Sequence, residues 1–343
     1  MTTASTTIAA SPAPKRSRIR MRPIMLTILM VVAVLVIGGF TLERIAQASD
    51  ARTYPAPGQM VTVNGIDLHF YVTGEATDQP TIILEGGNGG FSAQWVRVQE
   101  ALSEDTRVVS YDRAGLGWSD TDSEPRDIFR NAEQLRAGLQ ALDIQPPYIL
   151  VGHSLGGLFI RGYFEQYPDE VVGLVFVDAS HPEQIERIEG LSVDSSMTMY
   201  NSMALLANFG VTRLYNPLAT MVTTLPEQQR AESLAIGSTP KFFATTGNEL
   251  VIWQNVADQL RNEDNLGDLP IIALTAGENV ASDGGFGERG PLFRDLHLEL
   301  AALSTVGEHR VVEGSDHFSI IMASEYAPEV VDAVRDVLLA ATS

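Results

Sequence analysis

Short apolar runs alternate with longer amphipathic segments along most of the chain. Two runs of alternating character, 60–63 and 66–72, meet at Asn64-Gly65, a dipeptide that favours a tight β-hairpin turn. This hairpin predicts an antiparallel edge of a sheet. Six further short runs, rich in apolar or β-branched residues, predict its other strands: 81–84, 107–111, 148–151, 171–177, 270–275 and 309–312.

Helical patterns separate most of these runs. Apolar residues recur at intervals of three and four positions in 128–142, 155–167 and 328–341. Strands that alternate with helices form parallel sheets covered on both faces. We therefore predict an α/β fold with a mostly parallel, eight-stranded sheet and helices on both of its faces.

The strand pattern lapses between residues 183 and 268. Apolar stretches within this segment, 197–209 and 250–260, predict helices instead. We therefore expect one large domain over residues 59–343, with a helical cap inserted at about 183–268.

The N-terminus has another pattern. An uncharged apolar run from Pro23 to Phe40 is long enough to cross a bilayer as a helix. Five basic residues precede it: Lys15, Arg16, Arg18, Arg20 and Arg22. Because basic residues remain on the cytoplasmic side, the rest of the chain is expected outside the cytoplasm. Residues 1–48 thus predict a cytoplasmic stretch and a single-pass membrane anchor, and residues 49–58 a linker.

A signal peptide is the alternative interpretation of this segment. Ala46-Gln47-Ala48 has the small-x-small pattern of a signal-peptidase site, so cleavage near Ala48 would give a secreted protein. The apolar run is longer than most signal-peptide cores, which favours an uncleaved anchor.

Composition narrows the classes of function. The 343 residues are 45% hydrophobic, enough for one large core, and contain no cysteine, which excludes disulfides and thiolate chemistry. A net charge of −20 argues against nucleic acid and against anionic membrane surfaces as partners. No metal-ligand spacing is present, and no protein partner can be inferred.

Gly152-His153-Ser154-Leu155-Gly156 is the most informative motif. It lies where the predicted strand 148–151 passes into the predicted helix 155–167. A Gly-x-Ser-x-Gly sequence in this context is typical of a nucleophile elbow, whose strained turn lifts the serine hydroxyl out of the sheet. The two glycines avoid side-chain collisions in that turn. Ser154 is therefore the candidate nucleophile.

Four motifs occur in the order found in the α/β-hydrolase superfamily. They are Leu-Glu-Gly-Gly-Asn-Gly-Gly at 84–90, Tyr-Asp-Arg-Ala-Gly-Leu-Gly-Trp-Ser at 111–119, the Ser154 motif, and Gly-Ser-Asp-His-Phe at 314–318. From about Gly58 to its end the chain resembles the serine-hydrolase branch of that superfamily, which includes esterase- and lipase-like enzymes with a helical cap. The resemblance implies an α/β-hydrolase fold and hydrolysis without a cofactor.

A serine hydroxyl needs a base to accept its proton during attack. His317 follows the last predicted strand, in a loop opened by Gly314, where similar members of the superfamily keep this base. His153 is the neighbour of Ser154, but adjacent residues in an elbow point apart, so we expect it to pack beside the site. The other histidines are expected to be structural or exposed: His69, His181, His297 and His309.

A carboxylate must orient the imidazole of the base. The commonest superfamily location is the loop after 270–275, which contains Glu278 and Asp283 but lacks the usual Gly-x-x-Asp spacing. Asp178 directly follows the run 171–177, and a minority of the superfamily draws its acid from that strand. We favour Asp178, with Asp283 and Glu278 as alternatives.

The oxyanion of an acyl-transfer intermediate needs two hydrogen-bond donors. One is expected to be the backbone N–H of Leu155, the residue after the nucleophile. The second is expected from Gly87 or Asn88, in a glycine-rich segment that allows close approach of the backbone. Many relatives have His-Gly here, so the identity of the second donor stays open.

The segment 112–117 resembles a glycine-rich phosphate loop. It lacks the Gly-x-Gly-x-x-Gly order of dinucleotide-binding sites, and it is a structural turn common in the superfamily. We expect Asp112 and Arg113 to form an internal ion pair or to stabilise the turn.

Together these features predict a serine hydrolase that cleaves small-molecule carboxylic esters and needs no cofactor. Dehalogenases and epoxide hydrolases have Asp at the nucleophile position, so Ser154 argues against both. The alternatives are an aminopeptidase for N-terminal proline, a cofactor-free haloperoxidase or perhydrolase, and a non-catalytic binding protein. The peptidase would need an acidic pocket to bind the free amine of its substrate. Three glutamates lie at the start of the cap, but their spacing is equally typical of a solvated helix face: Glu183, Glu186 and Glu189.

Overall fold

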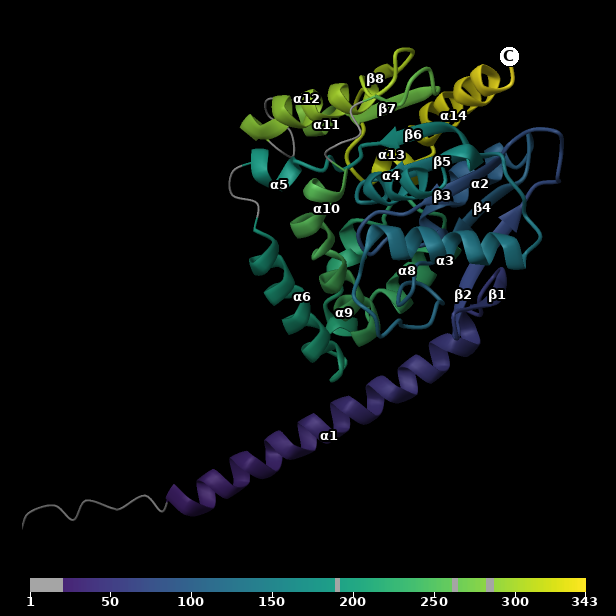
Figure 1. Cartoon of the computed structure of the whole chain (residues 1–343). Coiled ribbons are helices and arrows are strands. Elements are labelled where there is room, and N and C mark those ends of the chain that lie inside the picture. The colour runs from purple at the N-terminus through teal and green to yellow at the C-terminus, as the bar shows by residue number, and fades with distance from the viewer. Residues whose placement is uncertain (1–20, 189–191, 261–264, 282–286) are drawn as a thin grey trace, which may run out of the picture.

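The computed structural model describes residues 21–188, 192–260, 265–281 and 287–343. Eight strands form one sheet in the order β1-β2-β4-β3-β5-β6-β7-β8 (Figure 1). The strands are β1 (Gln59–Val63), β2 (Ile66–Thr73), β3 (Thr81–Glu85), β4 (Val108–Tyr111), β5 (Tyr148–His153), β6 (Val171–Val177), β7 (Ile271–Ala276) and β8 (Glu308–Val312). The predicted eight-stranded sheet is confirmed, and every strand ends within two residues of its expected position.

The hairpin forms the antiparallel edge of the sheet. β1 pairs with β2, and β2 pairs with β4, both antiparallel, while the other pairs are parallel. At the turn, Asn64 and Gly65 have φ values of 52° and 85°. Asn and Gly tolerate this left-handed conformation better than other residues, which is why the dipeptide marked the hairpin.

Helices cover both faces of the sheet. Alternate residues of one strand enter different cores: Ile82 packs on the side of α2 (Val96–Leu102) and α14 (Ala327–Ala341), and Ile83 on the side of α3 (Ile128–Ala141). Because both faces are covered, the central strands β3, β5 and β6 are buried almost throughout and largely apolar, whereas the edge hairpin alternates. α4 (Gly156–Gln166) and α12 (Gly290–Ala301) also cover the second face.

The described residues between β6 and β7 form helices and turns. They are α5 (Gln184–Arg187), α6 (Val193–Ala207), α7 (Val211–Leu214), a 3₁₀ turn (Pro217–Thr220), α8 (Glu227–Ile236), α9 (Pro240–Glu249) and α10 (Ile252–Leu260). α6 packs against α9. We refer to residues 183–268 as the cap segment.

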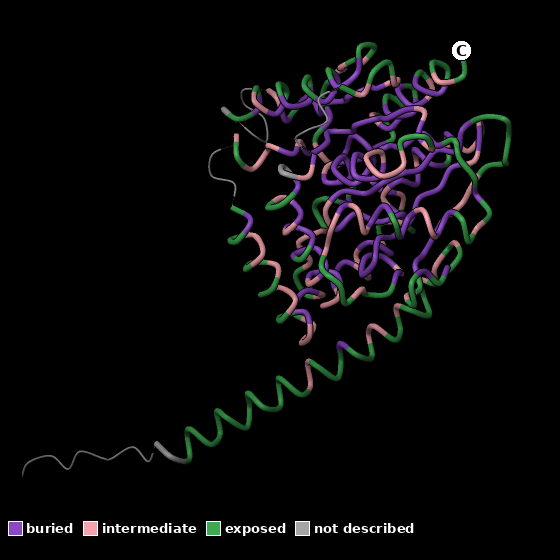
Figure 2. Tube along the Cα trace, viewed as in Figure 1, coloured by how far each residue is buried: buried purple, intermediate pink, exposed green. Residues whose placement is uncertain are grey.

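The N-terminal helix α1 (Met21–Thr53) projects from the body and is exposed over most of its length (Figures 1 and 2). From Pro23 onward it is long and apolar enough to cross a membrane. The helix continues beyond the expected anchor and includes residues 49–53 of the expected linker. Arg213 of the cap segment contacts these last turns, with its Nη1 2.7 Å from Asp50 Oδ2.

Candidate active site

Ser154 occupies a sharp turn between β5 and α4. Its φ is 53°, a left-handed conformation that is strained for serine. Two backbone contacts hold it: Ser154 N–H donates to the carbonyl of Val177 (3.1 Å), and Ser180 N–H donates to the carbonyl of Ser154 (2.8 Å). A Cβ at Gly152 would lie only 2.7 Å from the carbonyl carbon of Gly156. The turn therefore requires the glycines that identified the motif.

Asp178 and His317 are in direct contact. Asp178 follows β6, and its Oδ2 lies 2.5 Å from Nδ1 of His317. A carboxylate accepts, so Nδ1 carries the proton, and in the neutral ring Nε2 keeps a free lone pair. Two further donors hold the carboxylate: Ala276 N–H (2.9 Å) and Asn279 Nδ2 (2.7 Å).

The Asp178 side chain is buried and remains ionised at neutral pH. Burial by itself raises its pKa, but the hydrogen bond and the charge of His317, together with the Ala276 N–H, outweigh this effect and lower the pKa to about 2. The ionised carboxylate is thus kept as an acceptor for the Nδ1–H of His317.

The two alternative acids lie differently. Glu278 is exposed, and its backbone N–H donates to the carbonyl of Ser315. Asp283 lies outside the described residues. The loop after β7 instead contributes Asn279, which the sequence analysis did not identify. Asparagine does not titrate, and no motif marks it, so only its contact with Asp178 shows its position.

The glycine-rich segment after β3 approaches Ser154 closely. A Cβ at Gly87 would lie 2.8 Å from Cβ of Ser154. Arg113 Nη1 donates to the carbonyl of Gly86 and Nη2 to the carbonyl of Gly87, each at 2.6 Å. In a trans peptide the N–H points opposite to the C=O, so these bonds turn the N–H groups of Gly87 and Asn88 away from Arg113.

The side chain of Asn88 faces the cap segment. Its Nδ2 donates to the carbonyl of Thr246 in α9 at 2.9 Å. The side-chain amide of Asn88 is therefore engaged with the cap segment. The backbone N–H of Asn88 is the group that can donate to an oxyanion. Leu155, the other expected donor, is the N-cap residue of α4. Its N–H thus belongs to the positive end of a helix dipole.

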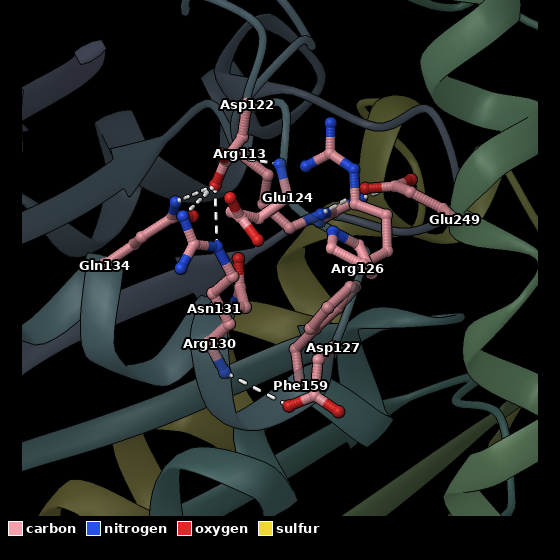
Figure 3. Close-up of a pocket in the computed structure, with 11 residues that line it drawn as sticks. Arg113, Asp122, Glu124, Arg126, Asp127, Arg130, Asn131, Gln134, Phe159 and Glu249 are labelled. Atoms are coloured by element: carbon pink, nitrogen blue, oxygen red, sulfur yellow. Dashed lines mark hydrogen bonds and ion pairs between the residues drawn. The ribbon is translucent and has the colours of Figure 1, made fainter. Parts of the chain in front are cut away.

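Arg113 is a buried cation between two carboxylates. Its Nε lies 2.7 Å from Oε1 of Glu249 (Figure 3). Its Nη1 lies 2.6 Å from Oε1 of Glu85. Burial disfavours the charge, but Glu249 and Glu85 overcome this and raise the pKa of Arg113. Arg113 thus pairs with these glutamates.

Asp112 instead stabilises the turn. Its carboxylate accepts hydrogen bonds from the N–H groups of Trp118 (2.9 Å) and Ser92 (2.8 Å) and pairs with His69.

A small cavity beside Arg113 has a volume of about 10 Å3 and is lined by charged residues that include Asp122 and Arg126 (Figure 3). This is about the space of a single water molecule. It is too small for a substrate.

His153 packs behind the catalytic candidates. Its Nε2–H donates to the carbonyl of His317 at 2.7 Å, and the two rings lie 4.7 Å apart. Burial, followed by the nearby charge of His317, lowers the pKa of His153 to about 3. The ring is therefore neutral, and its Nδ1 has no hydrogen-bond partner among the described residues.

A cavity of about 360 Å3 contains both Ser154 and His317 in its wall. The cap segment supplies much of its apolar lining: Met199, Tyr200, Met203, Pro217, Leu218, Met221, Val222, Phe242 and Phe243. A mostly apolar cavity with a few convergent polar groups is typical of sites for small organic ligands.

One group of described residues has metal-ligand geometry, namely His181, Glu183 and Glu299. Arg187 already engages Glu299, with its Nη1 and Nη2 at 2.6 and 2.8 Å from the two carboxylate oxygens. A cation would have to displace this pair, so we assign no metal there.

Comparison with known proteins agrees with this geometry. A family model described as alpha/beta hydrolase fold matches residues 80–212. The Bacillus subtilis protein YbdG, which is uncharacterized, is 26% identical over 231 residues, covering 66% of this chain and 69% of that protein. Another relative, from Schizosaccharomyces pombe, is matched over only 30% of its own length.

Two solved structures have the same fold at low sequence identity. The epoxide hydrolase CorEH superposes with a TM-score of 0.64 and 19% identity over 82% of this chain and 98% of its own. A thermophilic esterase from Thermogutta terrifontis superposes with a TM-score of 0.59 and 18% identity over 83% and 97%. Enzymes of different specificity thus share this architecture.

Proposed function

We propose that this chain, which belongs to the α/β-hydrolase superfamily, is a serine hydrolase that cleaves carboxylic esters through an acyl-enzyme intermediate. One observation carries the proposal: Ser154, in its strained turn, and the hydrogen-bonded pair His317–Asp178 meet at one cavity. Hydrolase activity agrees with the two solved structures of the same fold, an epoxide hydrolase and an esterase, whereas the ester specificity rests on the site itself.

In the proposed reaction, Ser154 Oγ attacks the carbonyl carbon of the ester. His317 Nε2 accepts the hydroxyl proton and then gives it to the departing alcohol oxygen. Asp178 stabilises the imidazolium formed in between. A water molecule then attacks the acyl-enzyme with His317 again as base, which releases the carboxylic acid and restores Ser154.

The negative charge on the carbonyl oxygen requires fixed donors. In this proposal the donors are the N–H of Leu155 and the N–H of Gly87 or Asn88. The hydrogen bonds from Arg113 to the carbonyls of Gly86 and Gly87 set the direction of the N–H groups of Gly87 and Asn88. All groups belong to the protein, so the mechanism uses no cofactor.

The lining of the cavity favours an ester over a substrate with a free amine. An aminopeptidase would need an unpaired carboxylate near Ser154 to bind the ammonium group. Glu249 is the carboxylate behind the glycine-rich segment, and Arg113 already neutralises it. Glu183, at the start of the cap segment, pairs with Arg187, and Glu189 lies outside the described residues.

We further propose that α1 anchors the chain as a single-pass membrane protein with the hydrolase domain outside the cytoplasm. The apolar span and the basic residues before it support this orientation. Secretion after cleavage near Ala48 is the alternative. An intact N-terminus in membrane fractions, read by mass spectrometry, would distinguish the two.

The function is tested with the full chain in detergent, as wild type and as Ser154→Ala. We expect hydrolysis of p-nitrophenyl esters that depends on acyl length and is absent in Ser154→Ala, together with covalent labelling of Ser154 by a fluorophosphonate. Circular dichroism checks that both proteins are folded. Full turnover by Ser154→Ala would contradict the mechanism, and preferential cleavage of proline p-nitroanilide would contradict the substrate class.

A further inference from the structure

One stretch of the cap segment carries almost no charge. Residues 195–226 contain a single charged side chain, Arg213, in a chain with 43 acidic and 23 basic residues. Arg213 bonds to Glu43 and Asp50 of α1, so even this charge is neutralised. The electrostatic repulsion between the acidic chain and an anionic membrane surface is therefore missing in this stretch.

The same stretch exposes large apolar side chains. Leu214 is 91% exposed and Tyr215 is 79% exposed, and three neighbours are also exposed: Leu205, Leu206 and Val211. We call these five residues the apolar cap surface. Scattered exposed apolar residues are ordinary, but these five all lie within residues 205–215, at the end of α6 and in and beside α7. A concentration of exposed apolar side chains is typical of an interaction surface.

The apolar cap surface lies next to the apolar part of α1. Phe209, between α6 and α7, approaches α1 so closely that a Cβ at Gly39 would lie 2.8 Å from its carbonyl oxygen. Four residues further along α1, Glu43 is buried and bonds to Arg213 Nε at 2.6 Å. Contacts just before α7 and within it thus hold this surface beside α1.

The position along α1 corresponds to the edge of a bilayer. The uncharged run from Pro23 to Phe40 has a helical length of ~27 Å, close to the ~30 Å hydrocarbon thickness of a membrane. Gly39, which touches Phe209, is therefore at the outer end of the span. The apolar cap surface follows at the level of the lipid headgroups, where tyrosine is enriched and where interfacial helices bury leucine side chains.

We propose that the apolar cap surface docks on the outer leaflet of the bilayer that α1 crosses, and that the substrates are apolar esters taken from this bilayer. The occupant of the surface is thus lipid. The contact is apolar rather than electrostatic, which is compatible with the acidic charge of the rest of the chain.

The substrate class, which rests on the proposed hydrolase function, is inferred from the residues of α6 and of the segment after α7 that line the cavity. Met199 and Met203 of α6, and Leu218 and Met221 after α7, line the cavity that contains Ser154. Met199 and Met221 are also exposed at the protein surface. The cavity therefore has apolar side chains at its outer edge, on the same part of the cap segment as the apolar cap surface, where an ester from the membrane can enter.

Docking is tested without reference to activity. The chain has no cysteine, so Leu214→Cys in the full-length protein gives a single site for an environment-sensitive fluorophore. Leu339→Cys is the matched control, because Leu339 is a 64% exposed leucine on α14, at the opposite end of the molecule (Figure 1). Both are reconstituted in phosphatidylcholine vesicles with and without nitroxide-labelled lipid.

We expect the label at position 214 to emit at shorter wavelength and to be quenched by nitroxide lipid, whereas the label at position 339 is quenched only by iodide in solution. Equal iodide quenching at both positions, with no lipid quenching at 214, would overturn the docking.

The substrate class is tested with Leu214→Asp and, as control, Leu339→Asp. We expect Leu214→Asp to lower hydrolysis of a long-chain ester dissolved in the vesicle by about tenfold, since a leucine leaves the membrane, and to leave a short water-soluble ester unaffected. Leu339→Asp should change neither rate. Equal rates for both variants on the membrane ester would overturn the substrate class. If wild type cleaves no ester, the proposed function fails while the quenching result stands by itself.

Discussion

Arg113 and Glu249 form a buried ion pair that joins the sheet to the cap segment, with Nε and Oε1 2.7 Å apart. The same glutamate accepts from the N–H of Gly89 at 3.1 Å, and the same arginine holds the carbonyls of Gly86 and Gly87. One network therefore connects α9 with the backbone that approaches Ser154. A change in the cap can reach the expected oxyanion donors through it.

Glu249→Gln should destabilise the protein strongly. The variant leaves the buried guanidinium of Arg113 with Glu85 as its remaining carboxylate partner, and losing one partner of a buried pair costs about 3 kcal/mol. Denaturant unfolding in detergent measures the free energy. Glu299→Gln is the control, because it removes the exposed partner of Arg187 and should cost less than about 1 kcal/mol. Equal losses in the two variants would contradict a structural role for the buried network.

Asp178→Asn should lower kcat by about 10⁴-fold with little change in KM, because the amide no longer stabilises the imidazolium of His317 or selects its tautomer. Glu278→Gln, in an exposed side chain, should leave kcat within about twofold of wild type. Asp283→Asn tests the remaining alternative. Loss of turnover in either of these variants, but not in Asp178→Asn, would assign the orienting acid to the loop after β7.

Gly87→Ala should reduce kcat by at least about 10²-fold, because the new Cβ would lie 2.8 Å from Cβ of Ser154 and must push the glycine-rich segment away from the nucleophile. Gly38→Ala is the matched control, since no heavy atom lies within 4 Å of the Cβ it adds. Its turnover should equal that of wild type. An unchanged kcat in Gly87→Ala would show that the backbone at residue 87 takes no part in the reaction.

The sequence predicted those parts of the molecule that depend on local pattern. Apolar runs identified the strands, Asn64-Gly65 marked the hairpin, and the glycines around Ser154 marked a turn that needs them. These signals are short in range, because each reflects the backbone or the burial of a few neighbouring residues.

Contacts between distant segments were not predictable in the same way. Glu249 is 136 residues from Arg113, and Asn279 is 101 residues from Asp178. Neither Glu249 nor Asn279 belongs to a sequence motif, because any acid or amide that packing brings to the same place could make the same contact. The last turns of α1, which ends at Thr53, likewise contact a distant residue, Arg213, and no motif around residue 50 indicated this contact.

The buried His153 should make stability depend on pH. Its folded pKa of about 3 lies below the ordinary value of 6.5, so the unfolded chain binds a proton that the folded protein rejects. The contribution of His153 to the free energy of unfolding is complete above pH 6.5, falls by about 1.4 kcal/mol per pH unit as the pH decreases, and levels off near pH 3.

The variant His153→Gln tests this dependence, because glutamine keeps a donor for the carbonyl of His317 but cannot titrate. We therefore expect the free energy of unfolding, measured with urea between pH 4.5 and 6.5, to fall less steeply in His153→Gln by about that slope. His297 and His181, whose pKa values are also lowered by burial, remain in both proteins and contribute equally. Identical slopes would mean that His153 is protonated in the folded state, and its hydrogen bond to His317 would then be made by an imidazolium.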